Sequence, residues 1–296
     1  MKVFVTGVCG QLGHDVVCRL KAQGHEPIGS DVAAGYDGEI PYVQLDITDP
    51  VAVEQALTRC APDAVVHCAA WTAVDAAEEP QNIPMVRAVN ALGTEHIARV
   101  CGALACKLVY ISTDYVFCGQ GDTPWQPEDT GFAPLNVYGQ TKLEGEQAVR
   151  ALTDRHFIVR IAWVFGKNGN NFVKTMLSLS EKYDTLRVVC DQIGTPTYTW
   201  DLARLLVDML ETEKYGTYHA TNEGFCSWAE FAAAIMKEAG IACRIVPVYS
   251  AAFPSPAKRP LNSRLSKISL DFASFQRLPD WHNALSRYLI ELSQSE

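Results

Sequence analysis

The first 166 residues alternate between short apolar strands and helical segments, and this order most limits the folds available to the chain. The strand segments are continuous runs rich in Val and Ile, which are typical of a parallel sheet covered by helices on both faces. With right-handed crossovers, the alternation predicts an α/β fold with a doubly wound, Rossmann-type parallel sheet. We expect strands at 2–7, 26–31, 42–46, 63–69, 107–113 and 156–166, and helices at 11–24, 50–61, about 82–105 and from about 136.

The pattern becomes less regular after residue 166. Further helices are expected near 199–213, 227–240 and 281–294, with a Pro-rich stretch at 247–260. We expect a dinucleotide-binding domain of residues 1–166 plus about 186–213. A smaller C-terminal α/β substrate-binding lobe would comprise about 167–185 and 214–296.

Composition excludes several classes of function. The net charge of −9 and the pI near 5.3 argue against a nucleic-acid-binding surface. The sequence shows no signal-peptide pattern, and no window reaches the ~18 apolar residues of a membrane span. The ten cysteines form no CxxC motif and no zinc-ligand spacing, which indicates reduced thiols. A cytoplasmic enzyme without membrane or nucleic-acid partners is expected.

A glycine-rich turn joins the first strand to the first helix. The sequence GVCGQLG places Gly7, Gly10 and Gly13 in a GxxGxxG pattern. Glycines there let the backbone turn tightly and approach a pyrophosphate, while the helix N-terminus offers free N–H groups and a favourable dipole. Three glycines alone are weak evidence, but the order strand, glycines, helix, strand and acid predicts a dinucleotide site.

Acidic residues end the second and third strands. The carboxylate of Asp31 would accept hydrogen bonds from the adenosine ribose and repel a 2′-phosphate. Because no Arg lies in or just after the glycine turn, NADH is favoured over NADPH, although either is a candidate. Asp46 and Ile47 would either frame the adenine or simply end the strand.

Tyr138 and Lys142 lie four residues apart on an expected helix, so they share one face. This is either an ordinary surface contact or a proton donor beside the cation that tunes it. Carbonyl reduction needs a hydride on carbon and a proton on oxygen, and a nearby ammonium is expected to lower the pKa of the phenol. Thr113, at the end of the fifth expected strand, would hold the carbonyl oxygen.

The glycine turn, Ser112-Thr113 and the YxxxK motif, taken in this order, resemble the extended short-chain dehydrogenases/reductases. Asn90 resembles the structural and proton-relay Asn of that family, or is an ordinary polar helix residue. Further segments are similar to the dTDP-4-dehydrorhamnose reductases almost from end to end. They are AAWTAVDAAE (69–78), YISTDYVFCGQGDTPW (110–125), APLNVYGQTKLEGE (133–146), GNNFVKTML (169–177), DQIGTPT (191–197) and KRPLNSRL (258–265).

This resemblance implies a set of roles for individual residues. Tyr138 would be the proton donor, with Lys142 and Thr113 completing the catalytic set. The implied cofactor-binding residues are Gly7, Gly10, Gln11, Leu12, Gly13, Asp31, Asp46, Ile47, Ala69, Ala70, Trp71, Thr72, Asn90, Tyr138 and Lys142. The implied substrate-binding residues are Thr72, Val74, Thr113, Asp114, Tyr115, Tyr138, Trp163, Asn171 and Arg259.

Three of these substrate-side residues have a second interpretation. Trp163 would pack on the sugar or belong to the core. Asn171, with Asn170, would cap the following helix or contact the substrate. Arg259 lies in a basic segment, with Lys258 and Arg264, that would pair with the diphosphate or be a solvated charge run.

The resemblance also bears on metal content and assembly. Some members bind Mg²⁺ through acidic residues at a dimer interface. Asp15 stands at one such position, but Trp200 stands at another. We therefore expect no metal in the chemistry, and either a monomer or a homodimer.

The resemblance implies NAD(P)H-dependent reduction of the C4 keto group of dTDP-4-dehydro-β-L-rhamnose. One alternative is another nucleotide-sugar reductase, dehydratase or epimerase of the same fold. A dehydratase needs added carboxylates beside the Ser/Thr, and here Asp114 is followed by Tyr115 without a Glu. The other alternative is a non-catalytic regulatory subunit resembling the β subunit of methionine adenosyltransferase.

Overall fold

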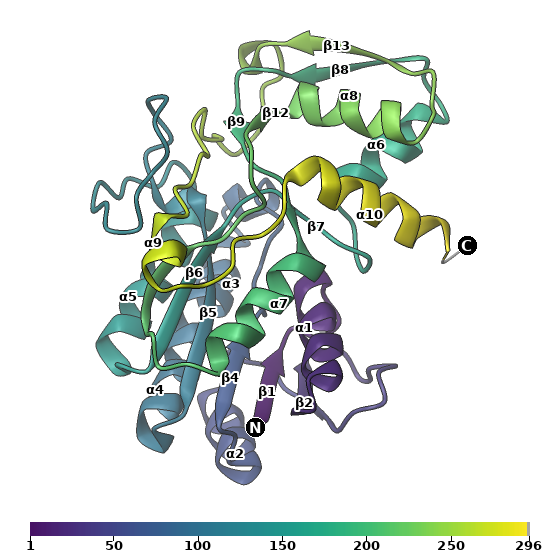
Figure 1. Ribbon diagram of the computed structural model, residues 1–296. Coiled ribbons are helices and arrows are strands. Elements are labelled where there is room, and N and C mark those ends of the chain that lie inside the picture. Colours follow the sequence, from purple (N-terminus) through teal and green to yellow (C-terminus); the bar gives the residue numbers. More distant parts are fainter. Residues whose placement is uncertain (295–296) are drawn as a thin grey trace.

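The computed structural model describes residues 1–294 and has a large sheet domain beneath a smaller lobe (Figure 1). The main sheet has seven strands in the order β11-β6-β5-β4-β1-β2-β3, and every neighbouring pair is parallel. The order reverses between β1 and β4, where an open parallel sheet forms a crevice. The expected doubly wound sheet is therefore confirmed. Its strands are β1 (Lys2–Thr6), β2 (Glu26–Asp31), β3 (Tyr42–Gln44), β4 (Ala64–His67), β5 (Lys107–Thr113), β6 (His156–Ile161) and β11 (Gly216–His219).

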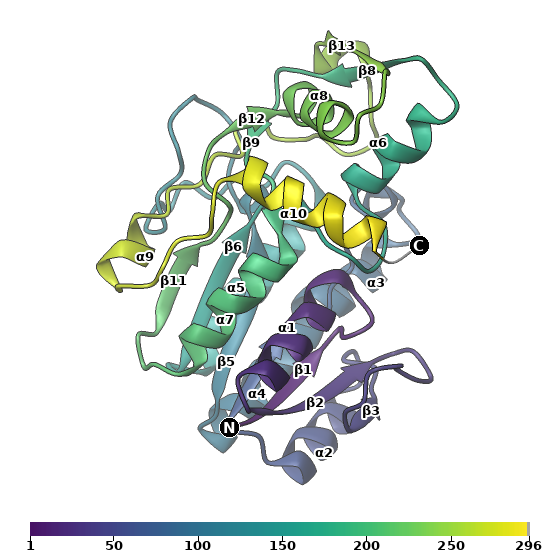
Figure 2. The same cartoon turned by 45° about the vertical axis from the view of Figure 1, so that its right-hand side comes forward.

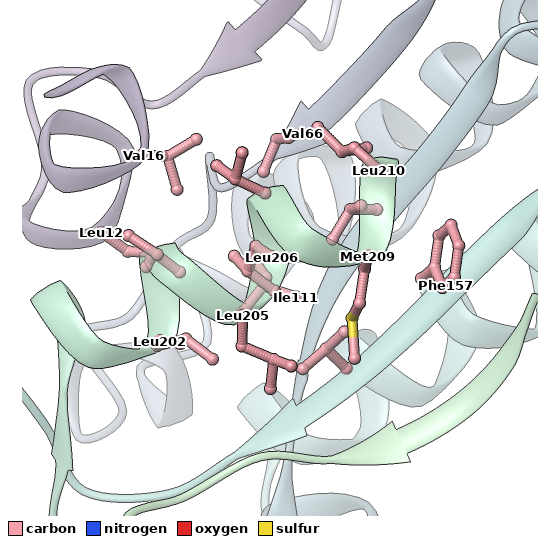
Figure 3. Packing of buried hydrophobic residues seen from close by; sticks show 14 of the residues in the cluster. Leu12, Val16, Val66, Ile111, Phe157, Leu202, Leu205, Leu206, Met209 and Leu210 are labelled. Carbon is pink, nitrogen blue, oxygen red and sulfur yellow. The ribbon is translucent and has the colours of Figure 1, made fainter. Parts of the chain in front are cut away.

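Helices cover both faces of this sheet. One layer contains α1 (Gln11–Ala22) and α7 (Thr199–Leu210), which pack against each other. Their Leu and Val side chains interdigitate with those of the sheet, including Leu12, Val66 and Leu206 (Figure 3). The other layer contains α2 (Pro50–Cys60), α4 (Thr94–Leu104) and α5 (Val137–Leu152), which bury a second apolar cluster against the opposite face.

The helix starts follow local sequence signals. The Asp49 carboxylate accepts hydrogen bonds from the N–H groups of Val51 and Ala52, and Pro50 occupies the first turn of α2. Asn136 caps α5 by accepting a hydrogen bond from the Gly139 N–H at 2.8 Å. The long helix expected at 82–105 consists of α3 (Ile83–Arg87), a π-helical turn η2 (Ala88–Gly93) and α4. Such turns inside helices are often found at functional sites.

The smaller lobe has its own apolar cluster. It contains α6 (Phe172–Ser180), α8 (Trp228–Glu238) and the parallel pair of β8 (Thr185–Val189) with β13 (Arg244–Val248). Helix α10 (Trp281–Ser293) runs between the lobe and the sheet domain, as the two views show (Figure 2). The remaining short elements are β7 (Val164–Phe165), β9 (Ile193–Gly194), β10 (Thr197–Tyr198), β12 (Cys226–Ser227) and α9 (Ile268–Phe272), with the 3-10 turns η1 (Ala76–Glu78), η3 (Asp114–Val116) and η4 (Ser250–Ala252).

The division into domains differs from the expected one at two strands. Strand β8 was expected in the dinucleotide-binding domain, but it pairs with β13 in the lobe. Strand β11 was expected in the lobe, but it extends the main sheet beside β6. The chain crosses between the two parts several times, and strand partners far apart in sequence leave no local signal. None of the helices in the described part of the chain is long and apolar enough to cross a membrane.

Candidate active site

A cavity of about 860 Å³ opens at the carboxyl ends of the central strands, between the sheet domain and the lobe. Of the fifteen predicted cofactor residues, all except Asn90 line it. Of the nine predicted substrate residues, all except Asn171 and Arg259 line it. The sequence motifs therefore converge on one space.

The glycine turn leaves no room for side chains. Gly7 has a φ of +70°, a left-handed conformation that favours glycine. A Cβ on Gly13 would lie 2.2 Å from the Gly7 carbonyl oxygen, so α1 packs directly on the turn. The N-terminus of α1 consequently reaches the cavity with Gly10, Gln11 and Leu12 on the lining. This cradle fits a dinucleotide pyrophosphate.

Asp31 lies at the end of β2, where the adenosine ribose of such a cofactor would sit. Its carboxylate accepts hydrogen bonds from the N–H groups of Cys9 at 3.1 Å and Val32 at 2.8 Å. Within residues 1–294, Lys142 is the one Lys or Arg among the lining residues. A 2′-phosphate next to Asp31 would therefore face a carboxylate without a compensating arginine.

Asn90 is placed behind the cavity wall, in the π-helical turn. Its side chain accepts a hydrogen bond from the Trp71 N–H at 2.8 Å, and donates to the Trp71 carbonyl and to the Thr141 hydroxyl. Its own carbonyl accepts a hydrogen bond from the Thr94 hydroxyl at 2.8 Å. Asn90 thus holds the loop that carries Trp71 against α5. In this structure it is a positioning residue.

Helix α5 is fixed to the sheet by a buried ion pair. The Arg160 guanidinium on β6 donates to both Glu146 oxygens at 2.8 Å, and both side chains have no exposed surface. The Ser112 hydroxyl donates to the same carboxylate at 2.6 Å, and Arg150 donates at 2.9 Å. Burial would raise the pKa of Glu146, but these partners hold it below its usual value. Glu146 stands one turn after Lys142, so the pair sets the position of the YxxxK face.

Tyr138, Thr113 and Lys142 all line the cavity, as the sequence predicts. The Tyr138 phenol contacts the Thr113 hydroxyl, and its ring packs edge-on against Tyr115 at 5.7 Å between centroids. The expected lowering of the phenol pKa is wrong. Burial raises the pKa of Tyr138 to about 12, and lowers that of Lys142 to about 7. The Lys142 ammonium lies 4.2 Å from the centre of the Tyr110 ring, and desolvation is the largest influence on the pKa of both Tyr138 and Lys142.

Aromatic side chains line the same cavity as Thr113, Tyr138 and Lys142. Trp163 stacks on Trp228 at 3.7 Å between ring centroids, and Phe172 packs against Trp228 at 4.5 Å. All three rings line the cavity. The backbone of Trp163 has a φ of +49°, which is strained for a bulky residue and fixes the ring between β6 and β7. Sequence reasoning missed Phe172 and Trp228, because only the tertiary fold brings them to Trp163.

Two predicted substrate residues are engaged elsewhere. Asn171 caps α6 by accepting a hydrogen bond from the Lys174 N–H, and its amide contacts Gln11, Gly166 and Tyr288. Of its two interpretations, the structure shows the helix cap. Arg259 forms a two-pronged ion pair with Asp75 at 2.7 and 3.1 Å. That pair joins the lobe to the loop that carries Trp71, Thr72 and Val74.

Asp15, the position considered for a metal at a dimer interface, is buried in α1. Burial raises the pKa of its carboxyl to about 6, and the neighbouring Arg19 guanidinium stacks on Trp200 at 3.9 Å. Within residues 1–294 of this one chain, no three His, Cys, Asp or Glu side chains cluster in a way that would hold a metal ion.

Comparison with known proteins agrees with this geometry. The family described as "RmlD substrate binding domain" matches residues 1–294. The dTDP-4-dehydrorhamnose reductase of Escherichia coli K12 is 37% identical over 306 aligned residues, which cover 99% of this chain and 98% of that protein. The chain belongs to the RmlD family.

Solved structures of RmlD-family reductases share the fold closely. A dTDP-4-dehydrorhamnose reductase from Clostridium acetobutylicum has a TM-score of 0.92 at 40% identity, covering 99% of this chain and 100% of that one. The Bacillus anthracis reductase, solved in complex with NADP, has a TM-score of 0.91 at 38% identity, with 98% and 99% coverage. A Thermus thermophilus UDP-glucose 4-epimerase, at 21% identity over 100% of both chains and a TM-score of 0.83, shares the fold alone.

Proposed function

We propose that this protein is an NAD(P)H-dependent oxidoreductase that reduces the C4 keto group of dTDP-4-dehydro-β-L-rhamnose to give dTDP-β-L-rhamnose. The observation that carries the proposal is the convergence of Thr113, Tyr138 and Lys142 with the glycine turn on one cavity. Curated RmlD-family relatives with 36–40% identity carry the name of this activity.

The residues serve two parts of the reaction, namely binding of the cofactor and transfer of a proton to the sugar. The turn of Gly7, Gly10 and Gly13 would hold the pyrophosphate, and Asp31 the adenosine ribose. A nicotinamide cofactor bound there supplies the hydride. Tyr138 would donate the proton to the carbonyl oxygen, Thr113 would hold that oxygen, and Lys142 would supply positive charge beside the phenol. The aromatic wall of Trp163, Phe172 and Trp228 would exclude water from the sugar.

The raised pKa of Tyr138 has a direct consequence for this mechanism. At neutral pH the phenol is fully protonated, so it is ready to act as an acid. Positive charge near the phenol must then stabilise the phenolate that forms. Burial lowers the pKa of Lys142 to about 7, so its positive charge is lost as pH rises through that value.

We further propose that NADH is preferred over NADPH, because Asp31 occupies the ribose side of the turn and no arginine lines the described cavity. We also propose a substrate role for Arg259. Its guanidinium is held by Asp75 and contacts Tyr115, which lines the cavity, and a diphosphate could compete for the same donors.

The first test measures absorbance at 340 nm with purified protein, NADH or NADPH, and the 4-keto sugar nucleotide made in situ by a 4,6-dehydratase and a 3,5-epimerase. Stoichiometric cofactor oxidation with dTDP-rhamnose as product is expected. Cofactor that is recycled during turnover would instead indicate a dehydratase or an epimerase. Cofactor binding without any oxidation would favour the regulatory-subunit alternative.

A further inference from the structure

Thr113, Asp114 and Tyr138 form a connected chain on the cavity wall. The Thr113 hydroxyl oxygen lies 3.1 Å from Asp114 Oδ1, so it donates a hydrogen bond to the ionised carboxylate and can accept one from the protonated carboxyl group. It also accepts a hydrogen bond from the Tyr115 N–H at 3.2 Å. The Tyr138 phenol contacts the same hydroxyl. A single hydroxyl thus connects the phenol to a buried carboxyl group.

The Asp114 carboxyl group is unusual in its surroundings. It is only 2% exposed, and within the described residues its Oδ2 atom is buried without a hydrogen-bond partner. Burial raises its pKa to about 7. The side chains that face it are the hydroxyls of Thr113 and Ser263 and the phenols of Tyr115 and Tyr138, which are neutral at this pH. A large fraction of Asp114 is therefore protonated at neutral pH.

Tyr138 needs a proton source after every turnover, because donating its proton leaves a phenolate. A route that ran from Lys142 through Asn90 would need contact between Asn90 and water in the cavity. Asn90 is 1% exposed and does not line the cavity. Its side chain bonds to Trp71 and Thr141, and its carbonyl accepts a hydrogen bond from Thr94. In this chain, Asn90 is committed to holding the fold.

We propose that Asp114 restores the proton of Tyr138 through the Thr113 hydroxyl. The Thr113 O–H bond breaks as its proton passes to the phenolate oxygen, and the Asp114 carboxyl proton passes to the Thr113 oxygen. The resulting carboxylate takes a proton from water after the product leaves. This inference rests on the proposed function, and it adds to Asp114 a role in restoring the enzyme between turnovers.

The pKa values favour the direction of this transfer. The proton moves from a carboxyl group with a pKa of about 7 to a phenolate whose conjugate acid has a pKa of about 12. Asp114 also lines the cavity, so water reaches its surroundings once the product has left. The chain is short, because one hydroxyl separates the phenol from the carboxyl group.

The test separates the first turnover from later ones in Asp114→Asn. With NADH bound and enzyme in excess of the keto sugar, stopped-flow absorbance at 340 nm reports one hydride transfer from protonated Tyr138. Steady-state kcat is expected to fall about tenfold or more, and the first-turnover rate is expected to fall by a clearly smaller factor. Imidazolium, an acid with a pKa of about 6.5 to 7, should restore kcat. Asp154→Asn is the matched control, because Asp154 is exposed before β6, at the far end of the sheet.

Wild-type protein supplies a second measurement that does not depend on the folding of a variant. Its kcat should fall as pH rises through about 7, with the first-turnover rate less affected. Loss of charge on Lys142, which titrates in the same range, would instead lower both rates together. An unchanged kcat in Asp114→Asn, or an equal loss in both rates, overturns the relay. Inactive wild-type protein would overturn the proposed function itself.

Discussion

Replacement of Arg160 by Met tests whether the buried ion pair holds α5 in place. The change keeps an apolar side chain beside Phe117 and Phe132, whose rings lie 5.0 and 5.1 Å from the guanidinium carbon. It removes both hydrogen bonds that Arg160 donates to Glu146 and leaves a carboxylate with no exposed surface. Breaking a buried pair in this way costs about 3–5 kcal/mol.

We expect the lower end of that range, about 3 kcal/mol. Ser112 and Arg150 still donate hydrogen bonds to Glu146, and Arg150 is exposed enough to move with it. The His219 ring nitrogen and the Pro127 carbonyl each lose the contact that Arg160 makes with them. These losses lower the stability further, so we do not expect a cost below about 3 kcal/mol. A loss of this size should lower Tm by roughly 6 °C or more.

The pH dependence distinguishes this explanation from a simple packing defect. In wild type the pKa of Glu146 is lowered, so its stabilisation is present above the unfolded value of about 4.3 and is lost as pH falls through the folded value. In Arg160→Met, burial should raise the pKa of Glu146. The carboxylate then takes up a proton as pH falls, and the free-energy cost of burying its charge becomes smaller. Urea denaturation should therefore show that the difference in free energy of unfolding between wild type and Arg160→Met becomes smaller from about pH 8 to about pH 5.

The double variant Arg160→Met with Glu146→Gln is the matched control. The double variant removes both charges, so it should lose less stability than Arg160→Met alone. The difference in its free energy of unfolding from wild type should also not become smaller as pH falls. A loss below about 1 kcal/mol for Arg160→Met, or a gap that stays constant with pH, would refute the reasoning.

Three further outcomes are expected at the site. Tyr138→Phe should lower kcat about 10²- to 10⁴-fold, with cofactor binding by calorimetry nearly unchanged; lost cofactor binding would contradict a proton-donor role. Asp31→Ala should weaken NADH and relatively favour NADPH in 340 nm assays, and an unchanged ratio would remove Asp31 from the ribose contact. Gly13→Ala should lower cofactor affinity about 100-fold or more, because its Cβ would lie 2.2 Å from the Gly7 carbonyl oxygen; Gly24→Ala, where a Cβ meets nothing within 4 Å, is the spatial control.

The parts of the fold that the sequence predicted are those governed by local patterns. Apolar strand runs, the glycine turn and the Asp49-Pro50 helix start each act within a few residues, and the structure confirms the elements they indicated. The placement of β8 and β11 was wrong because strand pairing depends on partners far away in the chain. A short apolar strand fits either sheet equally well until its neighbours are known.

The same distinction applies to the site. The motif residues Thr113, Tyr138 and Lys142 meet where the sequence suggested, since the carboxyl ends of parallel strands share one edge. Trp228 could not be predicted, because it starts a helix of the lobe and reaches the cavity only by stacking on Trp163. The phenol pKa was also misjudged, because the spacing of Tyr138 and Lys142 gives their separation but not the burial that dominates.

The contacts around the cavity also differ in strength, and this difference bears on how substrate enters. Helix α5 is held to the sheet by the buried Arg160–Glu146 pair, which is costly to break. The Asp75–Arg259 pair, which joins the lobe to the loop that carries Trp71, has side chains 45% and 28% exposed. Ion pairs of that exposure contribute about 0–1 kcal/mol, so exchanging Asp75 for a substrate phosphate would cost Arg259 little. The Asn136 amide at the start of α5 donates a hydrogen bond to the carbonyl of Lys258, the neighbour of Arg259. The exchangeable ion pair therefore lies next to the start of the helix that the buried pair holds in place.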